Sequence, residues 1–241
     1  MARSIRSRTA LPPQSTAPVL VVTGLAREAA SLVGEGVEPL LSGAAPARLR
    51  AALGARENAP YAFVVSFGLA GGLDPALAPG DFLLPEAIVA GPARYDAHGR
   101  GVALLREALT GEKIFGGLLA GAEAPAMTPR DKASLRGATG AAAVDMESHI
   151  AAEFAARRGI PFLALRVVCD PATRALPPLA AKAVTPDGGV DIALVLRELA
   201  RQPAQIADLI RAGLDSRKAF ASLRRGGPLL GPLLRLVLSG L

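Results

Sequence analysis

Five runs of apolar residues constrain this chain more than any other feature of its sequence, because the runs are continuous rather than alternating. A strand with one face in water alternates apolar and polar residues, whereas a strand covered on both faces is apolar throughout. We therefore expect strands that lie inside the protein, in a largely parallel sheet. The runs cover residues 19–23, 61–66, 82–84 with 88–89, 117–120 and 162–169.

Helical patterns lie between and after these runs, at residues 27–33, 47–53, 147–158, 191–200 and 204–214. Strands that alternate with helices predict an α/β fold, with a single domain built on a central, largely parallel mixed sheet and helices on both faces. The chain has 241 residues, of which 51% are hydrophobic, so it is long enough for one large core and too apolar for general disorder.

The formal net charge of +6 is unevenly distributed along the chain. Residues 1–18 contain three arginines and no acidic residue, and residues 211–241 contain six basic residues against one acidic residue. Residues 19–210 therefore carry a small negative net charge, which does not indicate a nucleic-acid-binding surface. A single cysteine, Cys169, excludes an internal disulfide framework and a CxxC zinc or redox motif.

The two ends of the chain are predicted to lie outside the folded domain, which spans residues 19–215. Residues 1–18 contain no apolar run of about 7–15 residues, so they predict a disordered basic arm rather than a secretory signal. Residues 216–241 form a tail in which a basic cluster precedes an apolar segment interrupted by Pro228, Gly231 and Pro232. No stretch reaches the roughly 18–20 continuous apolar residues of a membrane-spanning helix.

Two interpretations of this tail remain open. The tail either packs on the body or on a neighbouring subunit, or it makes a peripheral contact with the inner face of the membrane. In the second case its leucines insert into the lipid while its arginines meet anionic head groups. In both cases we expect a cytoplasmic protein. The leucines concerned are Leu229, Leu230, Leu233, Leu234, Leu236 and Leu238.

Acidic residues and glycines lie at four junctions, three of which follow predicted strands. Glu28 comes shortly after the first run, a glycine-rich segment at 67–72 follows the second, and Asp170 follows the last run, whereas Glu147 lies where residues 144–147 enter a predicted helix. One such acid alone is an ordinary cap, but ligands collect at the carboxyl ends of strands in sheets of this kind. The four junctions together therefore predict a ligand site. The glycine segment matches neither a dinucleotide-binding nor a P-loop fingerprint.

Three segments, in this order and spacing, resemble the superfamily of purine nucleoside phosphorylases and methylthioadenosine/S-adenosylhomocysteine nucleosidases. They read SFGLAGGLDPALAPGD at 66–81, VDMES at 144–148 and RVVCDPA at 166–172. Shorter segments are similar to the hopanoid-biosynthesis phosphorylases, which are thought to remove adenine from adenosylhopane. These are TGLAREA at 23–29, DKxxL at 131–135 and RxLPP at 174–178.

The resemblance covers about residues 19–215 and implies a nucleoside phosphorylase-like fold that cleaves the bond between a purine and C1′ of ribose. It implies a homo-oligomer that uses inorganic phosphate as co-substrate and needs no metal or organic cofactor. The substrate it implies is a small nucleoside, which in the hopanoid subfamily is linked to a lipid. It implies no nucleic-acid partner.

The resemblance also assigns roles to single residues. Asp170 matches the acid that protonates or hydrogen-bonds N7 of the leaving purine, and Glu147 matches the carboxylate that accepts hydrogen bonds from the ribose hydroxyls. Met146 matches a residue that packs against the sugar. This chemistry needs an acid at the base, because a purine anion leaves poorly, and an anion near the sugar, because its transition state is cationic. Burial of Asp170 among the apolar residues of 162–169 would help it to hold its proton.

The attacking group distinguishes phosphorylases, which use phosphate, from nucleosidases, which use water. Glu28 matches the carboxylate that positions water in the nucleosidases. Leu69 departs from the pattern, since many relatives carry a Ser or Thr there that contacts phosphate or water. Phosphate must then be held by backbone amides and by Arg27. The candidates for binding phosphate or water are Gly24, Arg27, Ser66 and Gly68.

Pro125 and Ala126 match the segment that holds the base in relatives.

Three functions follow from these assignments. The first is a phosphorylase for a purine nucleoside with a large apolar 5′ group, and the second is a hydrolytic nucleosidase for methylthioadenosine or S-adenosylhomocysteine. The third, a nucleoside-binding sensor without catalysis, is disfavoured by the presence of both Asp170 and Glu147. Adenine release with and without phosphate discriminates the three.

Overall fold

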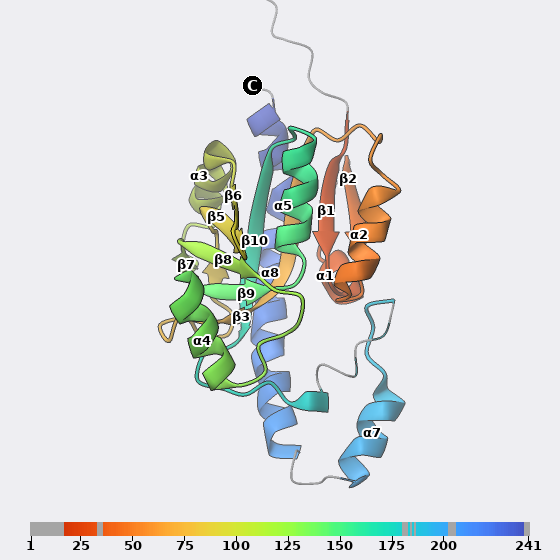
Figure 1. Cartoon of the computed structure of the whole chain (residues 1–241), viewed down its shortest axis with the longest axis vertical. Coiled ribbons are helices and arrows are strands. Elements are labelled where there is room, and N and C mark those ends of the chain that lie inside the picture. Colours follow the sequence, from red (N-terminus) through yellow and green to blue (C-terminus); the bar gives the residue numbers. More distant parts are fainter. Residues whose placement is uncertain are drawn as a thin grey trace, which may run out of the picture.

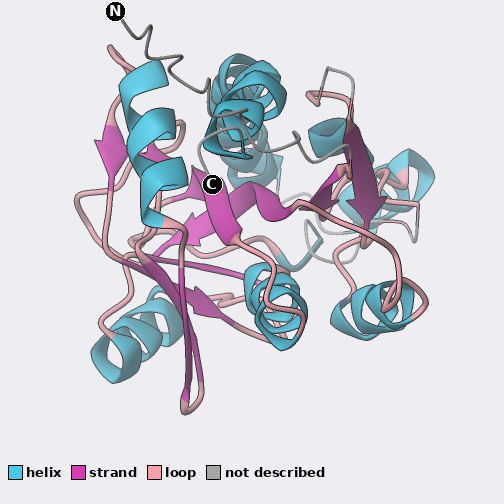
Figure 2. Ribbon diagram, turned by 90° about the horizontal axis from the view of Figure 1, so that it is seen from above, coloured by secondary structure: helices cyan, strands magenta, loops and turns pink. Residues whose placement is uncertain are grey.

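The computed structural model describes residues 17–32, 36–179, 183, 185, 187–201 and 206–238. It confirms a single α/β domain with a central mixed sheet between helices (Figures 1 and 2). The strands are β1 (Val19–Thr23), β2 (Val37–Leu41), β3 (Phe63–Gly72), β4 (Phe82–Leu83), β5 (Ala87–Ala90), β6 (Ala93–Asp96), β7 (Ile114–Phe115), β8 (Leu118–Gly121), β9 (Ala143–Asp145) and β10 (Phe162–Asp170). The helices are α1 (Ala26–Ala29), α2 (Pro46–Gly54), α3 (Gly99–Ala108), α4 (Pro129–Thr139), α5 (Ser148–Arg157), α7 (Ile192–Arg201) and α8 (Ile206–Leu238).

Helices cover both faces of the sheet, as the continuous apolar runs predict. On one face α2 and α5 contribute Leu53 and Phe154 to a core cluster, and on the other face α3 and α8 contribute Leu105 and Phe220 to a second cluster. Figure 1 shows α8 running the length of the molecule behind the sheet. The strands between the two clusters are buried on both sides, so their residues need no alternation of apolar and polar types.

Strand β3 is the centre of the sheet and pairs with three other strands. It runs parallel to β10 along most of its length and parallel to β1 over its first half, and it pairs antiparallel with β9 at its end. Val22 of β1 pairs with Ser66, and Val144 of β9 pairs with Gly71. The carboxyl ends of β1 and β9 therefore approach each other from opposite directions across residues 67–70 of β3, where neither strand is paired with it.

Several elements differ from the sequence expectation. The run at 61–66 predicts a strand that ends before the glycines, yet β3 continues to Gly72 and keeps its pairing with β10. Small residues allow this, because other side chains cross the strand closely at these positions. The helices α3 and α4 and the strands β2, β6, β7 and β9 have no counterpart among the predicted elements. Strand β2 contains Pro39 and lies at an edge of the sheet, where a missing N–H is tolerated.

The predicted domain boundary at residue 215 falls inside α8, so residues 216–238 are not a separate tail. Leu230 and Leu234, two of the leucines expected to enter a membrane, are fully buried against the body. The packing alternative is therefore the one that the structure supports. The buried hydrophobic side chains of this part of α8 are Ala219, Phe220, Leu223, Leu230, Leu234 and Val237. No helix in the described ranges has the length and apolar character needed to cross a membrane. Of the predicted basic arm at 1–18, residues 1–16 lie outside the described residues.

The helix continues through two prolines because of the faces on which they lie. Pro228 and Pro232 are exposed, so the carbonyl groups that lose an N–H partner there can be hydrated. The glycines lie on the buried face instead. A Cβ on Gly227 would stand 2.2 Å from the carbonyl oxygen of Ser31, so only glycine lets α8 lie this close to the body. In this part of α8 the prolines are thus tolerated on the exposed face, and the glycines permit close packing on the buried face.

If residues 216–238 belong to the core, shortening a buried leucine there should destabilise the whole domain. We expect Leu230→Ala to lower the free energy of unfolding by about 2–5 kcal/mol, as for other large-to-small core substitutions. The matched control is Leu236→Ala, since Leu236 is 56% exposed; its effect should stay within about 0.5 kcal/mol. Urea unfolding measures both values. Equal, small effects would show that this segment is not part of the core.

Candidate active site

A cavity of about 350 Å³ opens where the carboxyl ends of β1 and β9 meet the middle of β3. Most of the site residues predicted from the sequence line this one cavity, although they come from distant parts of the chain. These are Gly24, Glu28, Pro125, Ala126, Met146, Glu147 and Asp170. The gap in strand pairing at residues 67–70 leaves the space that the cavity occupies.

Glu28 lies on the short helix α1 with its carboxylate turned into the protein, and only 2% of the residue is exposed. Its Oε2 accepts hydrogen bonds from the backbone N–H groups of Gly24 at 2.7 Å and Leu25 at 2.8 Å, and Oε1 accepts one from Leu69 at 2.8 Å. Burial raises the pKa of Glu28, and this outweighs the opposing effect of the guanidinium of Arg166 and of the three N–H groups. The carboxyl is thus held rigidly at one wall of the cavity.

Arg166 of β10 is one of the residues around the site that the sequence analysis did not predict. It is paired with Gly68 in the sheet register and is fully buried. Its guanidinium crosses β3 and donates to the Oγ atoms of Ser66 at 2.5 Å and Ser148 at 3.1 Å, and to the carbonyl oxygen of Leu69 at 3.3 Å. A Cβ on Gly68 would stand 2.7 Å from both Arg166 Nη1 and Glu28 Oε1. Gly68 is therefore required as the space through which these two side chains meet.

The same guanidinium balances the acids around the cavity. It forms an ion pair with Asp145 Oδ2 at 2.5 Å and lies 3.7 Å from Glu147 Oε2. Asp145 is also bound by Ser148, whose N–H and hydroxyl both donate to it. A buried carboxylate is costly unless it is paired and hydrogen-bonded, so Arg166 makes this group of acids possible.

Glu147 immediately precedes α5 and faces the cavity beside Gly24. Its Oε1 accepts a hydrogen bond from Ser42 Oγ at 3.3 Å. Burial raises the pKa of Glu147 to about 7; Arg166 opposes the rise, and the nearby Asp145 and Glu28 add to it. The group therefore changes its charge near neutral pH, in the wall of the cavity.

Asp170 has different surroundings from those expected. The ammonium group of Lys132, which is buried, contacts Asp170 Oδ2 at 2.5 Å, so the carboxyl lies in an ion pair and not among apolar residues alone. Cys169 also lines the cavity, and its thiol donates to Asp170 Oδ1 at 2.8 Å. Burial raises the pKa of this thiol well above its usual range, so Cys169 is a neutral donor and not a nucleophile.

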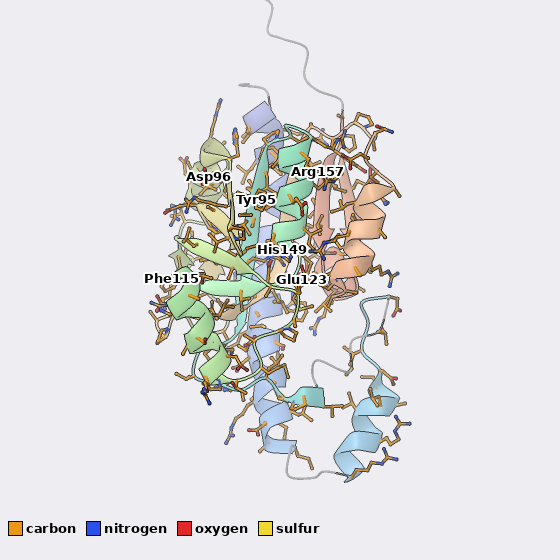
Figure 3. The ribbon with its side chains drawn as sticks, viewed as in Figure 1. Tyr95, Asp96, Phe115, Glu123, His149 and Arg157 are labelled. Carbon is orange, nitrogen blue, oxygen red and sulfur yellow. The ribbon has the colours of Figure 1, made fainter. Side chains whose placement is uncertain are left out.

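The segment that carries Pro125 and Ala126 is braced from outside the cavity. Glu123 accepts a hydrogen bond from Arg50 Nη1 at 2.9 Å and contacts His149 Nε2 at 3.0 Å. Figure 3 shows Glu123 next to His149 at the start of α5. The hydrogen bonds from Arg50 and His149 lower the pKa of Glu123 to about 2, so this carboxylate is charged at any ordinary pH.

Three predicted phosphate-binding residues do not line the cavity. Arg27 is exposed, and its guanidinium lies 4.3 Å from the ring centroid of Phe220 on α8. Ser66 is fully buried beneath the site, where its hydroxyl accepts a hydrogen bond from Arg166 and lies 3.0 Å from the hydroxyl of Ser148. Gly68 contributes space rather than a ligand contact. Helix α1 turns Glu28 inward and Arg27 outward because neighbouring residues on a helix point in different directions.

The sequence held a signal for some of the missed residues. Arg166 is a charged residue inside an otherwise apolar run, and Lys132 lies in the DKxxL segment. Asp145 stands beside Met146 and Glu147 in the VDMES segment. Ser42 offered no signal, because the strand before it was not predicted.

Comparisons with known proteins identify the family and the fold. The model of the phosphorylase superfamily matches residues 14–208. No curated protein sequence matches the chain. Among solved structures, the 5′-methylthioadenosine/S-adenosyl homocysteine nucleosidase of Helicobacter pylori, in complex with a pyrrolidine compound, is similar over 92% of this chain and 99% of its own, with a TM-score of 0.66 and 14% identity.

Two further structures have the same fold. The 5′-methylthioadenosine/S-adenosylhomocysteine nucleosidase of Neisseria meningitidis, in complex with methylthio-immucillin-A, matches over 93% of this chain and 99% of its own, with a TM-score of 0.64 and 17% identity. Futalosine hydrolase of Helicobacter pylori matches over 66% of this chain and 86% of its own, with a TM-score of 0.59 and 16% identity.

The contact across Gly68 leads to a stability prediction. In Gly68→Ala, the new methyl group must displace Glu28 or Arg166, so we expect a loss of about 1–3 kcal/mol in the free energy of unfolding. The matched control is Gly137→Ala in α4, where a Cβ meets nothing within 4 Å. This control should be stabilised by up to about 1 kcal/mol, because alanine favours a helix. Equal unfolding free energies of the two variants in urea would contradict the close approach.

The raised pKa of Glu147 predicts how stability depends on pH. Glu147 keeps its proton up to about pH 7 in the folded protein, whereas the usual pKa of a glutamate is 4.5. The contribution of protonated Glu147 to the free energy of unfolding is therefore fully present below about pH 4.5, and it is lost as the pH rises through 7. Glu147→Gln removes this titration. Its free energy of unfolding relative to wild type should therefore increase between pH 4.5 and pH 8, by up to about 3 kcal/mol. A difference that is independent of pH in urea unfolding would show that Glu147 does not titrate in this range.

Proposed function

Because this chain belongs to the phosphorylase superfamily, we propose that it is an enzyme that cleaves the bond between a purine and C1′ of its ribose, with water as the attacking group. The proposal rests on the residues brought together at the cavity. They provide a carboxyl for the attacking group, Glu28, a carboxyl for the sugar, Glu147, and a carboxyl for the base, Asp170.

The charge of the cavity walls is the observation that favours water over phosphate. Glu28, Asp145, Glu147 and Asp170 all line the cavity, and no lysine, arginine or histidine lines it in the part of the chain that is described. The nearby cation Arg166 is engaged by protein acceptors. A phosphate dianion placed beside these carboxylates would be repelled, whereas a neutral water molecule would not.

In the proposed reaction the oxygen of water forms a bond to C1′ while the bond from C1′ to N9 breaks and its electron pair moves into the purine. Glu28 accepts the proton that water gives up, for which a raised pKa is suitable. Glu147 accepts hydrogen bonds from the ribose hydroxyls, and its negative charge favours the positive charge that develops on the sugar. Asp170 takes up a proton from solvent before the base leaves and delivers it to N7, and the proton that Glu28 accepted returns to solvent.

The remaining walls favour a nucleoside with an apolar 5′ group. They consist mainly of small or aliphatic residues, among them Leu25, Ala44, Leu69, Val144 and Leu176. Methylthioadenosine is therefore a better candidate than a nucleoside with a charged 5′ tail. The same apolar character supports the second candidate, removal of adenine from a nucleoside that carries a large lipid-like 5′ group, by phosphorolysis as the sequence resemblance implies.

Release of adenine from 5′-methylthioadenosine, with and without phosphate, tests the proposal. We expect adenine and free methylthioribose in the absence of phosphate, with no acceleration when phosphate is added. Glu28→Gln should lower kcat by about 10²–10⁴, the usual effect of losing a general base. The control is Glu57→Gln, an exposed carboxylate that pairs with Arg157, which should keep wild-type kcat. A sugar phosphate as product would establish phosphorolysis instead, and absence of base release would contradict the proposed activity on 5′-methylthioadenosine.

A further inference from the structure

Lys132 carries a buried positive charge that the proposed reaction has not yet used. Only 1% of this residue is exposed, and its ammonium group has three acceptors. It donates to Asp170 Oδ2 at 2.5 Å, to the carbonyl oxygen of Pro171 at 2.8 Å and to that of Arg174 at 3.0 Å. The three hydrogens of the ammonium group are thus all used, which fixes its position.

The place of Lys132 in α4 makes its charge more costly. Thr128 caps this helix, with its hydroxyl accepting from Asp131 N–H, so that Lys132 lies in the first turn. A cation near the amino end of a helix is disfavoured by the helix dipole, and burial adds a desolvation cost. An apolar residue would fill this space without either cost. The charge therefore needs a specific reason, and its ionic partner is Asp170, the acid that faces the base.

The two carboxyl oxygens of Asp170 have different partners. Oδ2 is taken by Lys132, which does not line the cavity. Oδ1 is contacted by the thiol of Cys169, which does line it. When Asp170 is protonated, the ammonium hydrogen favours the carbonyl character of Oδ2, since a carbonyl oxygen is a better acceptor than a hydroxyl oxygen. The proton is then favoured on Oδ1, where the weak thiol donor gives way.

We propose that Lys132 is a positioning residue, which holds Oδ2 of Asp170 so that the proton for the departing base is presented from Oδ1. The inference rests on the proposed function. Two further bonds of the same ammonium group fix the loop at Pro171 and Arg174, and Leu176 N–H, further along this loop, donates to the carbonyl oxygen of Met127 at 2.8 Å. One cation thereby aligns both the acid and the loop beside the base-binding segment.

A double-mutant cycle separates this role from a merely structural one. Lys132→Met, Asp170→Asn and the double variant are compared with wild type for release of adenine from 5′-methylthioadenosine. We expect Asp170→Asn to lower kcat by about 10²–10⁴ and Lys132→Met to lower it at least tenfold, with KM changed less than about threefold because Lys132 does not touch the substrate. The double variant should be no slower than Asp170→Asn within about threefold, since Lys132 acts through Asp170.

The thermal midpoints of the same four proteins give a second readout that needs no activity. Asp170→Asn leaves the ammonium group buried without its anion, so its midpoint should fall by several degrees, and the double variant should recover part of that loss. Lys113→Met is the matched control, because Lys113 pairs with Asp81 at 3.0 Å away from the cavity. It should retain wild-type kcat and KM.

Losses in kcat that multiply in the double variant would overturn the inference, as would a kcat for Lys132→Met within twofold of wild type. If Lys132→Met does not fold, Lys132→Gln takes its place, since its amide can still reach the carbonyl groups of Pro171 and Arg174. Failure of the proposed function has a different signature, because the wild-type protein would then release no adenine at all.

Discussion

The buried guanidinium of Arg166 is the interaction on which the active site depends. It joins β10 to β3 through Ser66 and the carbonyl group of Leu69, and it neutralises acids that arrive from β1 and β9. Without a cation at this point, Glu28, Asp145 and Glu147 would be buried beside one another at a prohibitive cost. The acids at the ends of β1 and β9 can therefore lie close together because the positive charge of Arg166 lies between them.

Glycines allow two elements of the protein to approach closely, both at the active site and in the core. Gly68 lets Glu28 and Arg166 meet across β3, and Gly24 leaves room for the carboxyl groups of Glu28 and Glu147. Gly227 does the same for the helix that covers the opposite face, since it lies against the backbone at Ser31. In each case the absence of Cβ determines a distance between two elements, and that distance determines which groups can touch.

The proposed chemistry uses two separate pairs of cation and carboxylate. Arg166 serves the sugar side, where negative charge near C1′ is useful, and Lys132 serves the base side, where a proton must be presented in one direction. Both cations lie behind the carboxylates and not in the cavity walls. The cavity itself therefore remains negative and apolar, which favours a cationic transition state, a neutral attacking group and an uncharged 5′ substituent.

The sequence alone determined the buried strands, their alternation with helices and the acids at the strand ends, because continuous apolar runs and residues next to them are local properties. It also indicated that Gly24, Glu28, Glu147 and Asp170 would meet, since carboxyl ends of strands share one region of such a sheet. Only the tertiary structure decided the partners of Arg166 and Lys132, because an ion pair depends on strand register and on helix position rather than on neighbours in the chain. The tertiary structure also decided that α8 continues through Pro228 and Pro232. A proline is tolerated on the exposed face of this helix, and the packing of the helix on the body decides which face is exposed.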